Sequence, residues 1–175
     1  VINIITKSAK ETQGALLSAA YGTEDQPSVS ARYGGKLATN LFYRVYAKYF
    51  DREGFEDAHG RSAADDWDMA RGGLRLDWEA DERNTLTFLG DYFDGTYGEQ
   101  VGKMSVYPLT NVVIGIEAPT RGGNVLGRWQ HAFSQDSDLK LQAYYDHYER
   151  EHPYGGGVLV AEPDEFTASQ NLMNE

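Results

Sequence analysis

The stretch Leu41–Arg52, LFYRVYAKYFDR, separates into two faces when every second residue is read. One row is uncharged: Leu41, Tyr43, Val45, Ala47 and Tyr49. The other row carries three cations: Phe42, Arg44, Tyr46, Lys48, Phe50 and Arg52. Successive side chains of a strand point to opposite faces, and aromatic and β-branched residues favour strands. The pattern therefore predicts a β-strand.

The length of this strand is unusual for a soluble domain, where strands average about 5–6 residues. Its twelve residues span about 40 Å at roughly 3.4 Å per residue. A tilt of about 45° brings that span close to the ~30 Å of a bilayer core. A strand of this reach with one apolar face predicts an all-β chain that forms part of a transmembrane β-barrel.

The composition of the chain argues against several other classes of protein. The chain has 175 residues, a net charge of −11 and no cysteine. The negative charge argues against a nucleic-acid partner, and the lack of cysteine excludes disulfides and thiolate metal sites. No run of about 18 apolar residues occurs, so the sequence predicts no transmembrane helix.

The same alternation predicts further strands on either side of Leu41–Arg52. They cover residues 1–7, 14–21, 28–37, 69–78, 84–94, 122–133 and 139–150. After an initial short loop at 22–27, connections are short at 38–40, 79–83 and 134–138 but long at 53–68 and 95–121, and no element is expected beyond residue 150. We expect the apolar residues at 112–116 to form at most a short strand within the second long loop. Short turns on one rim and long loops on the other are typical of outer-membrane barrels.

The cations indicate which face meets lipid. A lysine or arginine that faces lipid at the midplane costs about 2–4 kcal/mol, so the cationic row is expected to face the lumen. The alternation places further cations on the equivalent face of their strands: Arg32, Lys36, Arg71, Arg75, Arg128 and Lys140. We therefore expect a basic lumen wall, with most acidic residues in the loops.

Several segments resemble the TonB-dependent outer-membrane receptors. VINIITK at 1–7 resembles the end of their plug domain. Their early barrel strands are similar to RYGGKL at 32–37, YRVYAKYFDREGF at 43–55, DDWDMARGGLRLDW at 65–78 and LGDYFDGTYG at 89–98. The resemblance runs over residues 1–150. It implies that 1–13 are the end of the plug and its connector, and that 14–175 are the first part of the barrel.

The resemblance also implies a function. Such receptors sit in the outer membrane of Gram-negative cells, in a plugged barrel of about 22 strands. They bind a scarce metal chelate, vitamin or glycan, and the inner-membrane TonB complex energises its uptake. The TonB box, most of the plug and all but about seven strands have no counterpart here. We expect a fragment of such a receptor, with a siderophore-type metal chelate or a similar large solute as its cargo.

The sequence contains no motif for catalysis or for a cofactor, and we expect no enzyme. His147 and His152 are spaced unlike any standard zinc signature, so no metal site is predicted. The candidates for solute binding are cations of the lumen wall and one rim aromatic: Arg44, Lys48, Arg71, Arg75, Arg128 and Tyr97. The cations can attract an anionic chelate. The alternative is that they pair with acidic groups of a plug or line a wet wall.

Two other classes remain open. A passive porin-like channel has no need of the plug-like VINIITK stretch before its first strand. A soluble β-sandwich or lipocalin-like binding module does not need strands as long as Leu41–Arg52. Both features favour the receptor, whose expected partners are outer-membrane lipid, the TonB complex through a missing N-terminal part, and the solute.

Overall fold

The computed structural model shows a chain built from one antiparallel β-sheet. The residues that it describes are 6–22, 25–56, 60, 62–106, 109–151, 159–160 and 167–172. Within them, one 3-10 turn, η1 (Lys10–Thr12), precedes the strands. None of the helical structure in this described part is long and apolar enough to cross a membrane. The prediction of an all-β, antiparallel chain is confirmed.

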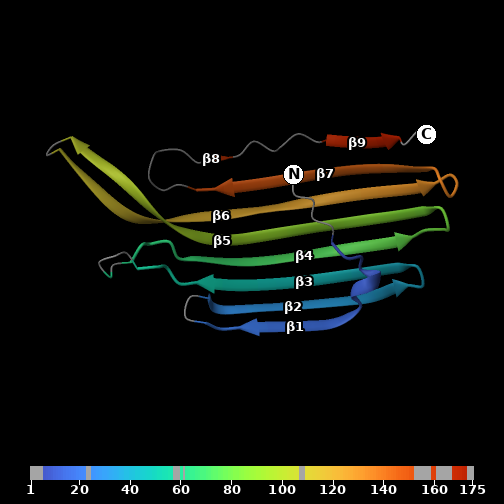
Figure 1. Cartoon of the computed structure of the whole chain (residues 1–175), viewed down its shortest axis with the longest axis horizontal. Coiled ribbons are helices and arrows are strands. Elements are labelled where there is room, and N and C mark those ends of the chain that lie inside the picture. The colour runs from blue at the N-terminus through green and yellow to red at the C-terminus, as the bar shows by residue number, and fades with distance from the viewer. Residues whose placement is uncertain are drawn as a thin grey trace.

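Nine strands make up the sheet in the described part of the chain. Their bounds are β1 (Gly14–Ala20), β2 (Asp25–Ala38), β3 (Leu41–Arg52), β4 (Trp67–Glu79), β5 (Asn84–Val106), β6 (Leu109–Ala132), β7 (Asp138–Arg150), β8 (Leu159–Val160) and β9 (Thr167–Leu172). Strands β1 to β7 follow one another in chain order, each antiparallel to the next (Figure 1). The short β8 and β9 pair with opposite ends of β7.

Strand β3 has the bounds that its alternation predicts. The neighbouring strands extend a few residues beyond their predicted ends, because the hydrogen-bonded ladder continues where the alternation of side chains weakens. Of the strand predicted at 1–7, residues 1–5 lie outside the described residues, and Thr6 and Lys7 belong to no strand.

The long connection predicted at 95–121 is wrong. Strand β5 continues to Val106 and β6 begins at Leu109, so the two strands pair along the whole segment. Beyond the ends of β4 and β7 they form a two-stranded arm that projects from the sheet (Figure 1). At the base of the arm one face is buried: Ile116 is 8% exposed and Ala118 0%, whereas Glu117 between them is exposed. The alternation is hidden in the sequence, because residues 112–114 are three apolar residues in a row and residues 98–100 contain none.

The expectation of no element after residue 150 is also wrong. The backbone of β8 pairs with Glu149 and Arg150, and that of β9 pairs with the stretch of β7 from Leu139 to Tyr144. Both strands are short and lie at the edge of the sheet. Their pairing depends on the edge that β7 offers rather than on a pattern of their own.

The registers give the sheet two distinct faces. We call the side that carries the uncharged row of β3 the apolar face, and the side that carries Arg44 and Lys48 the charged face. On the apolar face, a row across β3 to β7 runs Val45, Leu74, Gly90, Val125 and Tyr145. On the charged face, the row between Phe42 and Gln142 runs through Asp77, Thr87 and Arg128.

No second layer of described residues covers the apolar face. Leu17 is 78% exposed, Tyr92 57% and Trp78 45%. The buried hydrophobic residues among those described are few, and Ala9 and Phe42 lie on the charged side under η1. A large contiguous apolar surface on a folded chain marks a site of contact with another molecule or with a membrane.

Asp81 closes the turn between β4 and β5. Its Oδ1 accepts hydrogen bonds from the backbone N–H of Arg83 and of Asn84, each at 2.8 Å. The Arg83 N–H and the Asn84 side chain favour the charged form, and they lower the pKa of Asp81 below its ordinary value. The turn is therefore stabilised by an ionised carboxylate.

Asp81→Asn is expected to reduce stability at neutral pH. Because the folded-state pKa is depressed, the stabilisation is present above the unfolded pKa of about 3.9 and is lost as the pH falls through the folded value. Unfolding midpoints of wild type and variant, measured from neutral to acid pH, should converge at the acid end. A constant difference across the whole range would show that the charge of Asp81 does not matter.

Candidate functional site

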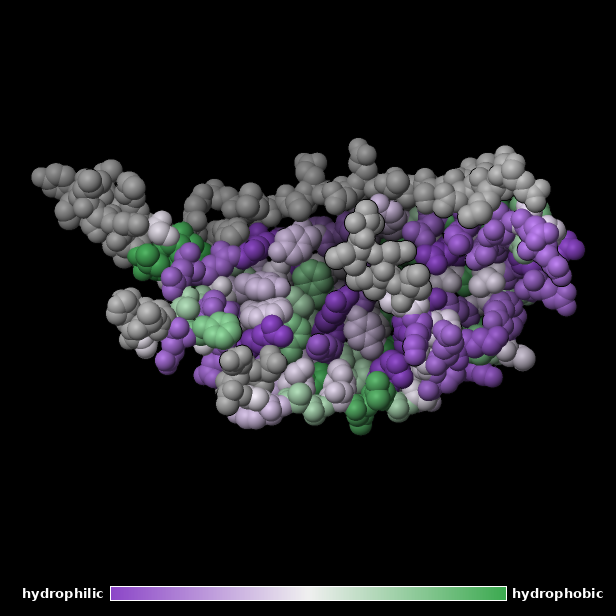
Figure 2. Space-filling model, in the orientation of Figure 1, coloured by the Kyte–Doolittle hydropathy of each residue, from purple (hydrophilic) through white to green (hydrophobic). Residues whose placement is uncertain are grey.

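The charged face brings the predicted cations together. Residues opposite each other across β3 and β4 include two like-charged pairs, Arg44 with Arg75 and Lys48 with Arg71. The registers also place Arg32, Lys36, Arg128 and Lys140 on this face, as the alternation predicts. Figure 2 is viewed from the side on which η1 lies, and it shows hydrophilic residues in purple spread over much of that side.

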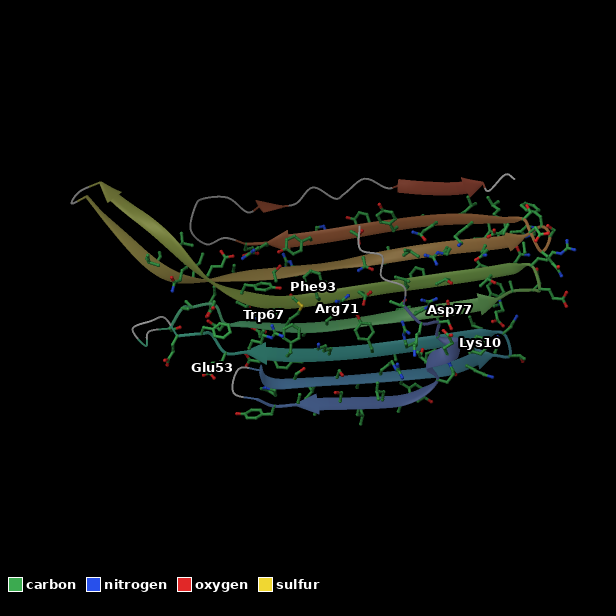
Figure 3. The ribbon with its side chains drawn as sticks, in the orientation of Figure 1. Lys10, Glu53, Trp67, Arg71, Asp77 and Phe93 are labelled. Carbon is green, nitrogen blue, oxygen red and sulfur yellow. The ribbon has the colours of Figure 1, made fainter. Side chains whose placement is uncertain are left out.

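Residues 6–13, which we call the docked segment, lie against the charged face near the short turns. The Lys10 ammonium contacts Glu79 at 2.7 Å and also lies over the ring of Phe42. Ala9 is fully buried, and Phe42 is only 3% exposed. Figure 3 shows Lys10 and Asp77 at this end of the strands, next to η1. A polar stretch of main chain is thus packed onto the sheet by specific contacts.

Asp77 is the centre of this contact. Its carboxylate accepts the N–H of Ala9 at 2.6 Å, the Nε–H of Arg75 at 2.8 Å and the hydroxyl of Thr87 at 2.9 Å. The residue is 7% exposed. A buried carboxylate is costly unless it is paired and hydrogen-bonded, and here the pairing comes from its own strand, from β5 and from the docked segment.

The docked segment also provides hydrogen-bond acceptors for the first like-charged pair. Arg44 Nη1 donates to the carbonyl oxygen of Lys7 at 2.9 Å, and Arg75 Nη1 donates to Thr6 Oγ1 at 2.9 Å. Two guanidinium groups that would repel each other are therefore held by acceptors from the docked segment and by Asp77.

The second like-charged pair lies further along the same strands. Arg71 Nη2 approaches Asp91 Oδ1 at 3.6 Å, and the same carboxylate accepts the hydroxyl of Tyr46. The side chains of Tyr46 and Asp91 pass over Gly73, where an added Cβ would lie 2.6 Å from the Tyr46 ring. The glycine makes room for this contact.

Four aromatic and cationic side chains stack at the far end of the charged face. The rings of Trp67 and Tyr97 are parallel, 5.2 Å apart. The Arg52 guanidinium lies over Trp67 at 5.0 Å, and that of Arg150 lies over Tyr97 at 5.5 Å. Both outer ring faces are thus covered by residues of the chain itself. The stack joins β3, β4, β5 and β7 and is better suited to holding these strands together than to gripping a solute.

Trp67→Ala is expected to lower the free energy of unfolding by about 2 kcal/mol. It removes two aromatic pairs, with Tyr97 and with Phe50, worth about 0.5–1.5 kcal/mol each, and one cation–π contact, worth about 0.5–1 kcal/mol. A denaturant titration measures the loss. Trp67→Phe keeps a ring in the stack and should recover part of it, whereas equal losses for the two variants would contradict a role for stacking.

The last two candidates for solute binding, Tyr97 and Arg128, lie away from both like-charged pairs. Tyr97 belongs to the stack, and Arg128 Nε donates a hydrogen bond to Gln142 Oε1 at 2.9 Å. Asp77 and Asp91 were not singled out, because we expected the acidic residues mostly in the loops. The sequence does contain a signal for Asp77: it follows Arg75 by two positions, which places both side chains on the same face of the strand. Among the described residues, no group of three potential ligands is arranged to hold a metal ion.

These features define a class of structure: a single antiparallel sheet with an uncovered apolar face and a charged face that carries a docked segment. No family model, no curated protein and no solved structure matches the chain. Its function is therefore inferred from the two faces and the resemblance alone.

Proposed function

We propose that this chain forms the first part of the barrel wall of a TonB-dependent outer-membrane receptor. The receptor would take up a siderophore-type metal chelate or a similarly large solute. The observation that carries the proposal is the pairing of an uncovered apolar face with a charged face onto which the docked segment packs. In a plugged barrel the first face meets lipid, and the second meets the lumen and the end of the plug.

On β3 the apolar face has the length of a lipid-facing band, whereas on β5 it ends earlier, because Asp94 lies in the row of Tyr49. Leu41 and Tyr49 are eight residues apart on β3, about 27 Å along the strand at roughly 3.4 Å per residue. A tilt of about 40° reduces this to about 20 Å, comparable with the ~25 Å apolar band of outer-membrane barrels.

Aromatic residues lie toward both ends of this band. Trp78 and Trp129 share a row near the short turns, and Tyr49 and Tyr92 lie toward the other end. Girdles of aromatic residues at both interfaces are typical of transmembrane barrels. Exposed tryptophan and tyrosine side chains are readily accommodated at the interface of a membrane, where one end is apolar and the other wet.

The open edges of the sheet also favour this assignment. In the described part of the chain, β1 pairs only with β2, so its other edge offers unpaired backbone groups. Such an edge is not tolerated in lipid, and it is satisfied when further strands close a barrel of about 22 strands. Strands β1 to β7 then belong to a longer wall, in which they are consecutive strands.

Uptake by cells tests the function. Cells that lack the receptor gene should lose uptake of one labelled ferric chelate, and the loss should be restored by the gene. Uptake should also stop when the TonB complex is removed. Unimpaired uptake of all chelates tested would contradict the siderophore assignment. Uptake that persists without the TonB complex would instead favour a passive porin-like channel.

A simpler measurement tests the membrane assignment. A chain that is monomeric and folded in aqueous buffer without detergent would contradict both membrane functions. It would point instead to a soluble binding module. We expect the chain to need detergent or lipid, because its apolar face is uncovered.

A further inference from the structure

The two like-charged pairs of the charged face differ in their surroundings. Like charges directly opposite each other on neighbouring strands are destabilising. Arg44 and Arg75 are relieved by Asp77 and by oxygen atoms of Thr6 and Lys7. Lys48 and Arg71 lie four residues further along the same strands, beyond these contacts.

The second pair, Lys48 and Arg71, has fewer contacts that offset the repulsion between its charges. The Lys48 ammonium lies 5.1 Å over the ring of Phe50, and no carboxylate of the described residues comes within ion-pair distance of it. Arg71 has one carboxylate partner among the described residues, Asp91 at 3.6 Å; it also interacts with the Tyr46 hydroxyl, and its side chain is 47% exposed. Asp91 is shared with Tyr46. The one carboxylate near this pair thus serves Arg71 and a hydroxyl group, and none among the described residues pairs with Lys48.

A third cation adds to the excess of positive charge over carboxylates on this part of the charged face. Arg32 lies on the same face of β2, two residues from Ser30, which is the direct partner of Lys48. The Nε atom of Arg32 is buried and has no hydrogen-bond partner among the described residues. Three neighbouring strands thus present Arg32, Lys48 and Arg71 on one face, and among the described residues only Arg71 of these three has a carboxylate partner.

We propose that Lys48 and Arg71, assisted by Arg32, form a binding site for an anionic group, a carboxylate or a phosphate, carried by a small solute. An anion between Lys48 and Arg71 relieves the repulsion as the docked segment does for Arg44 and Arg75. The stretch that precedes and includes the start of the docked segment, VINIITK, contains no acidic residue. This part of the chain therefore brings no carboxylate of its own to the pair.

The surroundings also limit the shape of the anion. Phe50 follows Lys48 on the same face of β3, and Phe93 is the direct partner of Arg71 on β5. Figure 3 shows Arg71, Trp67 and Phe93 in the same region, toward the end of the strands away from η1. The cations are thus flanked by apolar rings, which favours an anionic group on a largely apolar body. The inference that the cargo carries such a group rests on the proposed function.

The test uses inorganic phosphate and the purified full-length protein that contains this chain, in detergent micelles at constant ionic strength. Binding is followed by the side-chain Nε resonances of arginine. Wild type should bind phosphate saturably. Lys48→Met/Arg71→Met should bind about tenfold more weakly, since each exposed charge contact contributes up to about fivefold in affinity. The control Lys36→Met/Lys140→Met removes the same charge from the same face and should change affinity less than about twofold.

Folding provides a second readout. Removing one member of a like-charged pair should not destabilise the sheet, so Lys48→Met alone should unfold at the same or higher denaturant concentration in phosphate-free buffer. It should also lose the stabilisation that phosphate gives to wild type. If the double variant fails to fold, this single variant decides the question.

Equal affinity of wild type and the Lys48/Arg71 variant, or no saturable binding by wild type, would overturn the site. The outcome is separate from the proposed function, because binding is measured without transport. Saturable binding at Lys48 and Arg71 with no chelate uptake by cells would remove the receptor function and leave the anion site standing.

Discussion

Tyr145→Arg is expected to lower the free energy of unfolding in a lipid bilayer by about 2–4 kcal/mol. Tyr145 lies on the apolar face in the row of Val45, halfway between the rows of Leu41 and Tyr49, and is 44% exposed. An arginine there must leave water for hydrocarbon or distort the bilayer around it. Denaturant titration in lipid vesicles measures the loss.

The neighbouring residue provides a matched control. Tyr144 is in the same strand, is also a tyrosine and is similarly exposed, but it lies on the charged face. Tyr144→Arg should change stability by no more than about 0.5 kcal/mol, as is usual for exposed positions. The two substitutions have the same chemistry and differ only in the face. Equal effects of both in vesicles would mean that the apolar face does not contact lipid.

Asp77→Asn is expected to lower the free energy of unfolding by about 3 kcal/mol. The substitution leaves the Arg75 guanidinium, whose side chain is 13% exposed, without its carboxylate. Removing one partner of a buried ion pair costs about 3–5 kcal/mol, because the other charge remains uncompensated. Ala9 loses a charged acceptor at the same time, so hydrogen exchange of its amide should become faster.

Glu79→Gln is the control for Asp77→Asn. It removes a carboxylate that also holds the docked segment, through Lys10, but both side chains of this pair are about half exposed. An exposed ion pair contributes about 0–1 kcal/mol, so the loss should be much smaller. The double variant Arg75→Met/Asp77→Leu should be more stable than Asp77→Asn, because it buries no unpaired charge. Similar losses for Asp77→Asn and Glu79→Gln would show that Asp77 is not the main anchor.

The strands of the sheet body could be predicted because their signal is local. Residues of β3 alternate between an uncovered apolar face and a charged face, so twelve consecutive residues carry the whole pattern. The same holds for the placing of Lys48 and Arg71 on one face. The arm between Gly98 and Glu117 was missed, since three consecutive apolar residues at 112–114 and the lack of apolar residues at 98–100 hide the alternation in its sequence.

The candidate site was predicted only in part. Arg44, Lys48, Arg71 and Arg75 were identified as one cationic wall, which the registers support. Their division into a pair held by the docked segment and a pair without comparable partners could not be predicted, because it depends on where residues 6–13 lie. The stack at Trp67 and Tyr97 was likewise missed, since its two arginines come from β3 and β7.

The sequence by itself determined that the chain is built of long two-faced strands with cations on one face, because the geometry of a strand ties each side chain to its neighbours two residues away. Only the tertiary structure decided what those cations contact. The bond from Ala9 to Asp77 spans 68 positions of the chain, and that from Lys10 to Glu79 spans 69. Contacts at such separation follow from the register of the strands and the path of the docked segment, and no local pattern encodes them.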